Sequence, residues 1–155
     1  MSARERLSWA ETGICLAYEI ARCRSQDPYL IVGAFAKKHD GSVVLGYNGA
    51  PCGIDIDWSN RDERRKRVLH AESNTLNFCQ PGEVEMLCVT HLPCSECIKV
   101  IAQKKIKQVY FSEFAAGYDA RLTAKLAGEF GISIRQIPFD SIAKLTENTG
   151  VRAED

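Results

Sequence analysis

Apolar residues spaced three and four positions apart open the chain and predict a first helix. The spacing places them on one face of a helix over about residues 4–24. The residues of this face are Leu7, Ala10, Ile14, Ala17, Tyr18 and Ala21. The dipeptide Asp27-Pro28 interrupts the pattern, so we expect the helix to end before it.

Two apolar runs follow this helix, over residues 29–36 and 42–47, and a short polar segment with Asp40-Gly41 separates them. Runs of this length on either side of a turn sequence predict two strands of a hairpin. Residues 48–60 contain glycine and proline and show no periodicity, so we expect a loop there. Loops of this length often carry function.

Helical and strand patterns alternate along the rest of the chain. We expect, in order, a helix over about 68–79, a strand over 86–90, a helix over about 94–104, and then a strand over 108–111, a helix over 120–130 and a strand over 132–137. This alternation predicts an α/β fold, with helices layered on both sides of a mixed or partly parallel sheet. We expect a single domain over 1–155 with its core over about 5–137, and a short helix and a frayed polar end after Pro138.

Composition narrows the function. With 45% hydrophobic and 26% charged residues the chain is an ordinary globular protein. Its 20 basic and 20 acidic residues balance, which argues against a protein that grips nucleic acid and favours a small substrate. The sequence has neither an apolar run of the roughly 20 residues that a membrane span requires nor the apolar region of a signal peptide, so we expect no membrane partner and a cytoplasmic location.

Seven cysteines make an odd count, and in a reducing compartment they rarely form disulfides. Two of them stand in the sequence Pro93-Cys94-x-x-Cys97, and the sequence His70-x-Glu72 lies upstream. A catalytic zinc takes three nitrogen or sulfur ligands from the protein and leaves a fourth position to water. His70, Cys94 and Cys97 supply three such ligands, and the start of a helix favours the thiolate form of cysteine.

Glu72 is the candidate catalytic residue. It lies two positions after His70, where a carboxylate can take a proton from water that zinc has activated and hand it on. Both motifs together are the signature of zinc-dependent nucleobase deaminases, in which water replaces an exocyclic amino group.

Two other interpretations compete with this one. A Cys-x-x-Cys pair also serves as a redox pair or as half of a closed structural zinc site, which needs a fourth protein ligand. His91 is the best candidate for that ligand, because Cys79 and Cys88 lie in apolar runs typical of core residues. A structural site, however, has no use for Glu72 or for Pro93 next to the first cysteine.

Four segments resemble the deoxycytidylate (dCMP) deaminase family, and together they extend over about residues 5–137. Ser25-Gln26-Asp27-Pro28 followed by Val32-Gly33-Ala34 is similar to the family stretch S-K-D-P-x-x-x-V-G-A. The other three are Gly46-Tyr47-Asn48-Gly49-Ala50-Pro51-Cys52-Gly53, His70-Ala71-Glu72-Ser73-Asn74 and Thr90-His91-Leu92-Pro93-Cys94-Ser95-Glu96-Cys97. The short chain is similar to phage-type and bacterial-type members, which would place a viral protein in the host cytoplasm.

The resemblance implies a fold, a reaction and a set of site residues. The fold is the cytidine deaminase-like three-layer α/β/α arrangement with a five-stranded mixed sheet. The reaction converts dCMP and water to dUMP and ammonia and supplies dUMP for dTMP synthesis. His70, Cys94 and Cys97 would hold Zn²⁺ and Glu72 would move protons. Asn48, Ala71 and Pro93 would contact the nucleotide, although Asn48 also suits a turn before Gly49.

Recognition of the phosphate is expected from Ser25 and Arg24, because Gln26 stands where the family usually has lysine. Arg24 at a helix end is equally consistent with a solvated side chain. Tyr118 follows the fourth predicted strand, in a region that lies over the substrate in the family, and a packing role competes there too.

The family also implies regulation and assembly. Many members are hexamers that dCTP activates and dTTP inhibits, with Mg²⁺ accompanying the triphosphate. Five residues are the candidates for this effector site, three from the glycine-rich loop and two from the basic run 60–67, which a solvated surface also explains. They are Gly49, Pro51, Gly53, Arg64 and Arg65. Apolar surface left on a small domain favours a homo-oligomer.

Three alternatives to dCMP deamination remain open. The first is a deaminase of another cytosine nucleotide or nucleoside, such as dCTP or deoxycytidine. The second is a deaminase of a base in nucleic acid, which the neutral charge disfavours. The third is not an enzyme but a binding module that zinc stabilises.

Overall fold

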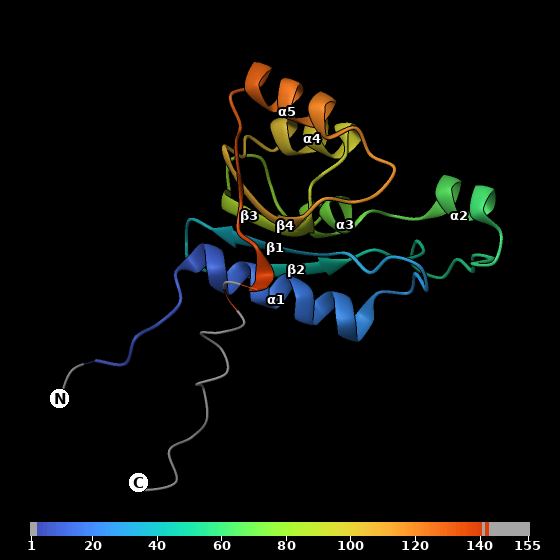
Figure 1. The fold of residues 1–155 in the computed structure, drawn as a ribbon, viewed down its shortest axis with the longest axis horizontal. Helices are drawn as coiled ribbons and strands as arrows, with labels where there is room; N and C mark the ends of the chain where they lie inside the picture. The colour runs from blue at the N-terminus through green and yellow to red at the C-terminus, as the bar shows by residue number, and fades with distance from the viewer. Residues whose placement is uncertain (1–2, 141, 143–155) are drawn as a thin grey trace, which may run out of the picture.

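The computed structural model describes residues 3–140 and 142, and in this part of the chain helices and strands alternate as Figure 1 shows. The helices are α1 (Trp9–Arg24), α2 (Arg61–Arg67), α3 (Ala71–Leu76), α4 (Ser95–Gln103) and α5 (Ala120–Glu129). The strands are β1 (Gly33–Lys38), β2 (Val43–Tyr47), β3 (Val84–His91), β4 (Gln108–Glu113) and β5 (Ser133–Gln136).

The strands form one five-stranded sheet in the order β2-β1-β3-β4-β5. β1 pairs antiparallel with both β2 and β3, whereas β4 pairs parallel with β3 and with β5. A short turn joins β1 to β2, whereas the chain from β2 to β3 runs through a long loop, α2 and α3. Each parallel pair is joined through a helix, α4 or α5. The predicted five-stranded mixed sheet is therefore confirmed.

Helices cover the two faces of the sheet, which confirms the three-layer arrangement (Figure 1). α1 packs on one face, and α3, α4 and α5 pack on the other. Alternate residues of each central strand divide between the faces. In β3, for example, Met86 and Cys88 pack with Ile14 of α1, whereas Leu87 and Val89 pack with Ile98 and other residues of the opposite core.

Glycine allows α1 to lie close to the sheet. A Cβ atom added at Gly33 would stand 1.9 Å from the backbone oxygen of Ala17, and one added at Gly13 would stand 2.5 Å from the sulfur of Cys88. The N-terminus of α1 is fixed by a capping box, in which Ser8 Oγ accepts from the Glu11 N–H and the Glu11 carboxylate accepts from the Ser8 N–H.

Several boundaries differ from the sequence prediction. α1 begins at Trp9 rather than at about residue 4, and β4 extends to Glu113 rather than to residue 111. β1 begins at Gly33 rather than at residue 29, because Asp27 Oδ1 accepts from the N–H groups of Tyr29 and Leu30 and holds this stretch in a turn. The helix expected over 68–79 extends only over Ala71–Leu76, because the chain before it is extended and Leu69 forms a β-bridge with Gly49. β3 is longer than expected at both ends.

The helix α2 was not predicted. It consists only of charged residues, none of them buried, so it has no apolar face that periodicity could reveal. Asn60 caps it by accepting from the Glu63 N–H. α2 stands at one end of the sheet, away from the two covering layers (Figure 1).

The short helix expected after Pro138 is present at Phe139, Asp140 and Ile142, and Ile142 is buried against the α1 side of the sheet. The frayed polar end lies outside the described residues. None of the helices within residues 3–140 and 142 has the length and apolar character needed to cross a membrane.

Candidate active site

Three metal-ligating side chains meet where two helices begin. His70 precedes α3, Cys94 precedes α4, and Cys97 lies in the first turn of α4. Their ligand atoms all lie within 4.8 Å of one another. His70 Nδ1 lies 3.3 Å from Cys97 Sγ and 3.6 Å from Cys94 Sγ, so Nδ1 is the nitrogen that faces the sulfurs.

The two helix starts leave these side chains free to bind a metal. His70 and Cys94 occupy N-cap positions in extended conformations, yet neither side chain makes a capping hydrogen bond. The unpaired N–H groups at the start of α4 favour a negatively charged sulfur nearby. Both helices follow extended segments that reach the same end of the sheet, so the fold brings together residues that are 24 positions apart in the sequence.

The charge on the sulfurs is suited to a divalent cation. The pKa of Cys94 falls to about 4, because the Cys97 thiol and the His70 ring hydrogen-bond to its sulfur. The hydrogen bond to Cys94, with burial, raises the pKa of Cys97, so the metal-free chain holds one thiolate. A bound cation stabilises both sulfurs as thiolates. Zinc, with bonds of about 2.0–2.3 Å, requires neighbouring nitrogen and sulfur ligands about 3.6 Å apart, which matches the separations from His70.

Glu72 lies in the first turn of α3, beside these ligands, and is only 4% exposed. Burial raises the pKa of its carboxyl group, and a hydrogen bond from Cys97 opposes this shift. A carboxyl group with a raised pKa exchanges protons near neutral pH more readily than an ordinary one. Glu72 is not part of the cluster that His70, Cys94 and Cys97 form among the described residues.

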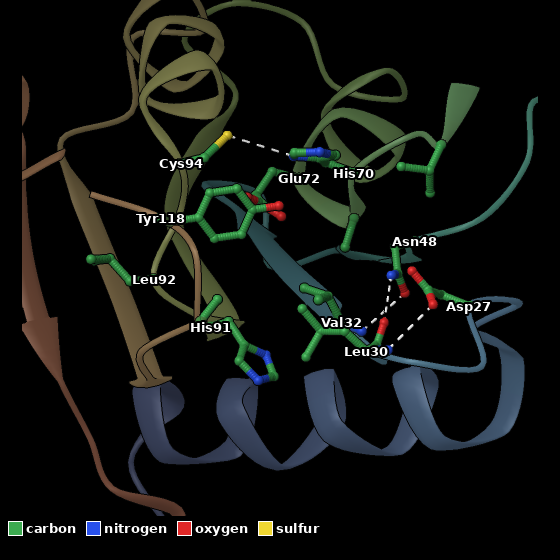
Figure 2. Close-up of a pocket in the computed structure, with 13 residues that line it drawn as sticks. Asp27, Leu30, Val32, Asn48, His70, Glu72, His91, Leu92, Cys94 and Tyr118 are labelled. Atoms are coloured by element: carbon green, nitrogen blue, oxygen red, sulfur yellow. Dashed lines mark hydrogen bonds between the residues drawn. The ribbon is translucent and has the colours of Figure 1, made fainter. Parts of the chain in front are cut away.

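A pocket opens next to this cluster, and its empty space, with the open solvent at its mouth included, is about 480 Å³. Figure 2 shows its walls, with Cys94 and His70 at one end and α1 beneath the other. The lining residues are Asp27, Leu30, Val32, Asn48, Val68, His70, Ala71, Glu72, His91, Leu92, Cys94, Ala115 and Tyr118.

The Asn48 side chain lines this pocket, and most of its hydrogen-bonding groups already have partners. Its Oδ1 accepts from the Val32 N–H at 2.9 Å and from Ser25 Oγ, and its Nδ2 donates to Leu30 O at 2.8 Å. A side-chain amide has two acceptor sites and two donor hydrogens, so one N–H of Asn48 is left over for a ligand. Asn48 therefore both fixes the wall of the pocket and offers it a donor.

Other predicted contact residues are distributed around the opening. Ala71 lines the pocket at the start of α3, and Tyr118 lines it from the loop after β4, with its ring centroid 6.3 Å from that of His70. Pro93, which was also expected to contact the nucleotide, is not among the lining residues, and its backbone oxygen accepts from Thr123 Oγ1 at 2.9 Å. Burial raises the pKa of the Tyr118 hydroxyl, so this group stays protonated as a donor.

The residues expected at the phosphate do not line the pocket. Ser25 ends α1 and donates to Asn48, whereas the exposed Arg24 lies with its guanidinium 6.0 Å from the ring centroid of Tyr47. Gln26 accepts from the Ala50 N–H at 2.7 Å and so fixes the turn after Asn48. A Cβ atom at position 49 would lie 2.5 Å from Gln26 Oε1, so a larger residue there would displace the Gln26 side chain.

The remaining candidates for effector binding separate into two groups. Pro51 accepts from Ile54 N–H, and Gly53 has a positive φ of 76°, so both shape the turn after Asn48. Arg64 lies 4.2 Å from the Tyr29 ring centroid and 4.0 Å from Asp27 Oδ2, and thus ties α2 to the pocket wall. Arg65 lies beside the loop that carries Tyr118, because its guanidinium would be 3.9 Å from a Cβ atom added at Gly117.

His91 lies in the pocket but is not part of the ligand cluster. In the described residues the cluster contains only His70, Cys94 and Cys97, and Figure 2 shows His91 at the opposite end from them. The rival ligands Cys79 and Cys88 are buried in the core clusters on either side of the sheet. Sequence reasoning did not identify His91 or Asp27 as lining residues, because neither belongs to the zinc motif.

Comparisons with known proteins agree with this geometry. Residues 7–113 match the family model described as the cytidine and deoxycytidylate deaminase zinc-binding region. Deoxycytidylate deaminase of Mus musculus is 35% identical over 79% of this chain and 77% of its own. An uncharacterized deaminase in the luxG 3′ region of Aliivibrio fischeri is 32% identical over 85% of this chain and 95% of its own. The crystal structure of dCMP deaminase from the cyanophage S-TIM5 with dCMP and dUMP superposes with a TM-score of 0.68 at 25% identity, covering 86% of this chain and 100% of the other.

Proposed function

The chain belongs to the cytidine and deoxycytidylate deaminase family, and we propose that it deaminates dCMP hydrolytically to dUMP and ammonia. The observation that carries the proposal is the meeting of His70, Cys94 and Cys97 beside the buried Glu72, at one end of a pocket. The name of the mouse relative and the nucleotides in the S-TIM5 structure support dCMP as the substrate. The product dUMP would serve dTMP synthesis.

Zn²⁺ fits the three ligands, with His70 binding through Nδ1 and both cysteines as thiolates. When bound there, zinc supplies a nucleophile at neutral pH by lowering the pKa of a water toward about 7. The other steps fall to the side chains around it.

Glu72 moves the protons of the reaction. Its carboxylate takes a proton from the attacking water and delivers it to N3 of the cytosine ring as the oxygen bonds to C4. The remaining hydroxyl proton then passes through Glu72 to the exocyclic amino group, the C4–N4 bond breaks, and ammonia leaves. The raised pKa of Glu72 suits both directions of transfer.

Three groups of the pocket are proposed to hold the nucleotide. Ala71 presents its backbone to the pyrimidine, Tyr118 covers the base or the sugar, and the remaining N–H of Asn48 donates to a sugar hydroxyl. Pro93 shapes the turn that carries Cys94. Tyr118 comes from the loop between β4 and α5 rather than from the sheet.

Turnover of dCMP, dCTP, deoxycytidine and a short cytosine-containing oligonucleotide, measured as ammonia release, tests the proposal. We expect dCMP to give the highest kcat/KM. A preference for any of the other three would contradict the choice of substrate. Zinc binding without turnover of any of them would favour the binding-module alternative.

Regulation and assembly extend the proposal. We propose a homo-oligomer, with a hexamer favoured, in which dCTP with Mg²⁺ activates and dTTP inhibits near Gly49, Pro51 and Gly53. Arg65 is exposed and faces solvent beside the Tyr118 loop, whereas Arg64 is engaged with Tyr29. Sedimentation and dCMP turnover, each measured with and without each triphosphate, test this extension. If neither triphosphate changes either measurement, the extension is contradicted.

A further inference from the structure

The pocket contains an unexplained shortage of positive charge. A nucleoside monophosphate brings a phosphate dianion, and charge-assisted hydrogen bonds are the strong contacts to phosphate. The pocket lining, as far as the described residues define it, includes no lysine and no arginine. It does include the acidic side chains of Asp27 and Glu72. His70 is directed at the two sulfurs, so His91 is the lining residue left that can carry positive charge.

His91 ends β3 and is held in a defined orientation. Its side chain is 11% exposed, and its Nδ1 lies 2.8 Å from Thr90 Oγ1. That hydroxyl already accepts from the Gly33 N–H at 3.2 Å, so its own hydrogen is available to donate to Nδ1. A ring that accepts at Nδ1 carries its hydrogen on Nε2.

The Nε2–H group of His91 has no hydrogen bond to any described residue. Glu113 Oε2 lies 3.9 Å away, beyond hydrogen-bond range, and that carboxylate accepts from the Tyr18 hydroxyl. Burial lowers the pKa of His91, and the Glu113 carboxylate opposes this shift. The side chain therefore presents a buried N–H donor, and a hydrogen bond from it to a phosphate dianion is charge-assisted because the acceptor is ionised.

The place of His91 in the pocket matches the far end of a nucleotide. The reacting carbon of the base must lie next to His70 and Cys94, whereas Figure 2 shows His91 at the end nearest α1. A nucleoside monophosphate is elongated, so a base at the metal end directs its sugar and phosphate toward the other end. Asn48 also lines the pocket, and Figure 2 shows its side chain away from Cys94.

We propose that His91 Nε2–H donates a hydrogen bond to the 5′-phosphate of the substrate and makes the pocket selective for nucleotides over nucleosides. This inference rests on the proposed function. It assigns to His91 the phosphate contact that Arg24 was expected to make. Asp27 does not prevent it, since its carboxylate accepts from Tyr29 and Leu30 and faces Arg64 at 4.0 Å.

The test is a calorimetric titration of the zinc-loaded chain with dUMP and with deoxyuridine, which differ only in the phosphate. In wild type we expect dUMP to bind more tightly. In His91→Leu we expect the affinity for dUMP to fall about 10-fold to 100-fold, as for a lost charged hydrogen bond, with deoxyuridine little changed. His91→Gln keeps an N–H donor but cannot take up a proton beside the bound phosphate, and it should fall in between. His39→Gln, at an exposed histidine outside the pocket, is the matched control and should behave as wild type.

Two patterns of affinity would overturn the proposal. The first is an equal loss for dUMP and deoxyuridine in both variants of His91, or no loss in either. The second is a loss confined to dUMP in Arg24→Ala that is absent in the His91 variants. If His91→Leu fails to fold, His91→Gln alone tests the proposal, because it must still show a dUMP-specific loss. A wild-type chain that converts no dCMP would remove the proposed function itself, which the turnover assay reports separately.

Discussion

Replacement of Glu72 by glutamine tests the catalytic mechanism most specifically. The amide has nearly the shape of the carboxyl group but cannot accept and return a proton. General acid–base catalysis by one positioned side chain contributes typically about 10²–10⁴-fold. Because Glu72 is expected to serve two successive transfers, we expect kcat for dCMP to fall by at least about 10³-fold, with a smaller change in KM.

The same substitution should leave the metal site and the fold in place. The ligand atoms belong to other residues, and the Glu72 side chain is packed in the interior at 4% exposure. Burial raises the pKa of Glu72 above its unfolded value. In the metal-free chain, ionisation of Glu72 therefore lowers stability as the pH rises from the unfolded pKa toward the folded pKa. Glu72→Gln lacks this penalty, so its Tm relative to wild type should increase with pH across that window.

Three measurements are needed: release of ammonia from dCMP, zinc content of the purified protein, and Tm by circular dichroism across that pH window. Glu96→Gln is the matched control, because Glu96 lies between the two cysteines but its side chain is 77% exposed, and its one ion pair within the described part of the chain is with Lys99. It should retain activity, since exposed ion pairs contribute about 1 kcal/mol or less. Near-normal turnover in Glu72→Gln, or loss of its zinc, would refute the assigned role.

Three further predictions concern the ligands and the packing beneath them. Cys97→Ala should lower zinc affinity by at least about 100-fold, measured by competition with a chelator, because removal of a direct ligand exceeds the loss of a residue that only supports one. In the metal-free chain, the thiolate absorbance that Cys94→Ser removes should titrate near pH 4. The Cys94 thiolate stabilises the folded state, and this stabilisation should be lost as the pH falls through that value. Gly33→Ala should lower the free energy of unfolding by about 1–3 kcal/mol in a denaturant titration, because the new methyl group would meet the backbone oxygen of Ala17 at 1.9 Å and force α1 away from the sheet. A midpoint near pH 9 for Cys94 in the metal-free chain would contradict the electrostatic account. Wild-type stability of Gly33→Ala would contradict the packing account.

The parts of the fold with a strong hydrophobic pattern were predictable. α1 shows a clear helical spacing, and β3 is a continuous apolar run because both of its faces are covered. α2 lacks any buried residue, so no pattern of apolar positions could have found it. The cap at Asn60 was a usable local signal, since asparagine favours the N-cap and glutamate follows three residues later.

The metal centre was more predictable than the rest of the pocket. Spacing within His70-x-Glu72 and Cys94-x-x-Cys97 is local, so the start of a helix nearly fixes the relative directions of the side chains. The pocket wall instead depends on contacts between distant segments, such as Asn48 with Leu30. His91 enters the pocket only because β3 ends beside α1, which no local pattern reveals.

Gln26 is a second residue whose contacts could not be predicted from the sequence. Its position in a stretch similar to a family motif suggested a role at the phosphate, but its side chain accepts from the Ala50 N–H across the loop. A motif position does not state which way a side chain points. That direction follows from the turn after Asn48, which brings Ala50 to the end of α1.

The most direct test of the account is the conversion of dCMP by chain stripped of metal and then titrated with Zn²⁺, with dUMP and ammonia both quantified. We predict no conversion without metal, recovery that saturates at one zinc per chain, and equal amounts of the two products. Unchanged turnover after complete removal of zinc, or a fully zinc-loaded chain that leaves dCMP intact, would contradict the claim that His70, Cys94, Cys97 and Glu72 form a deaminase centre.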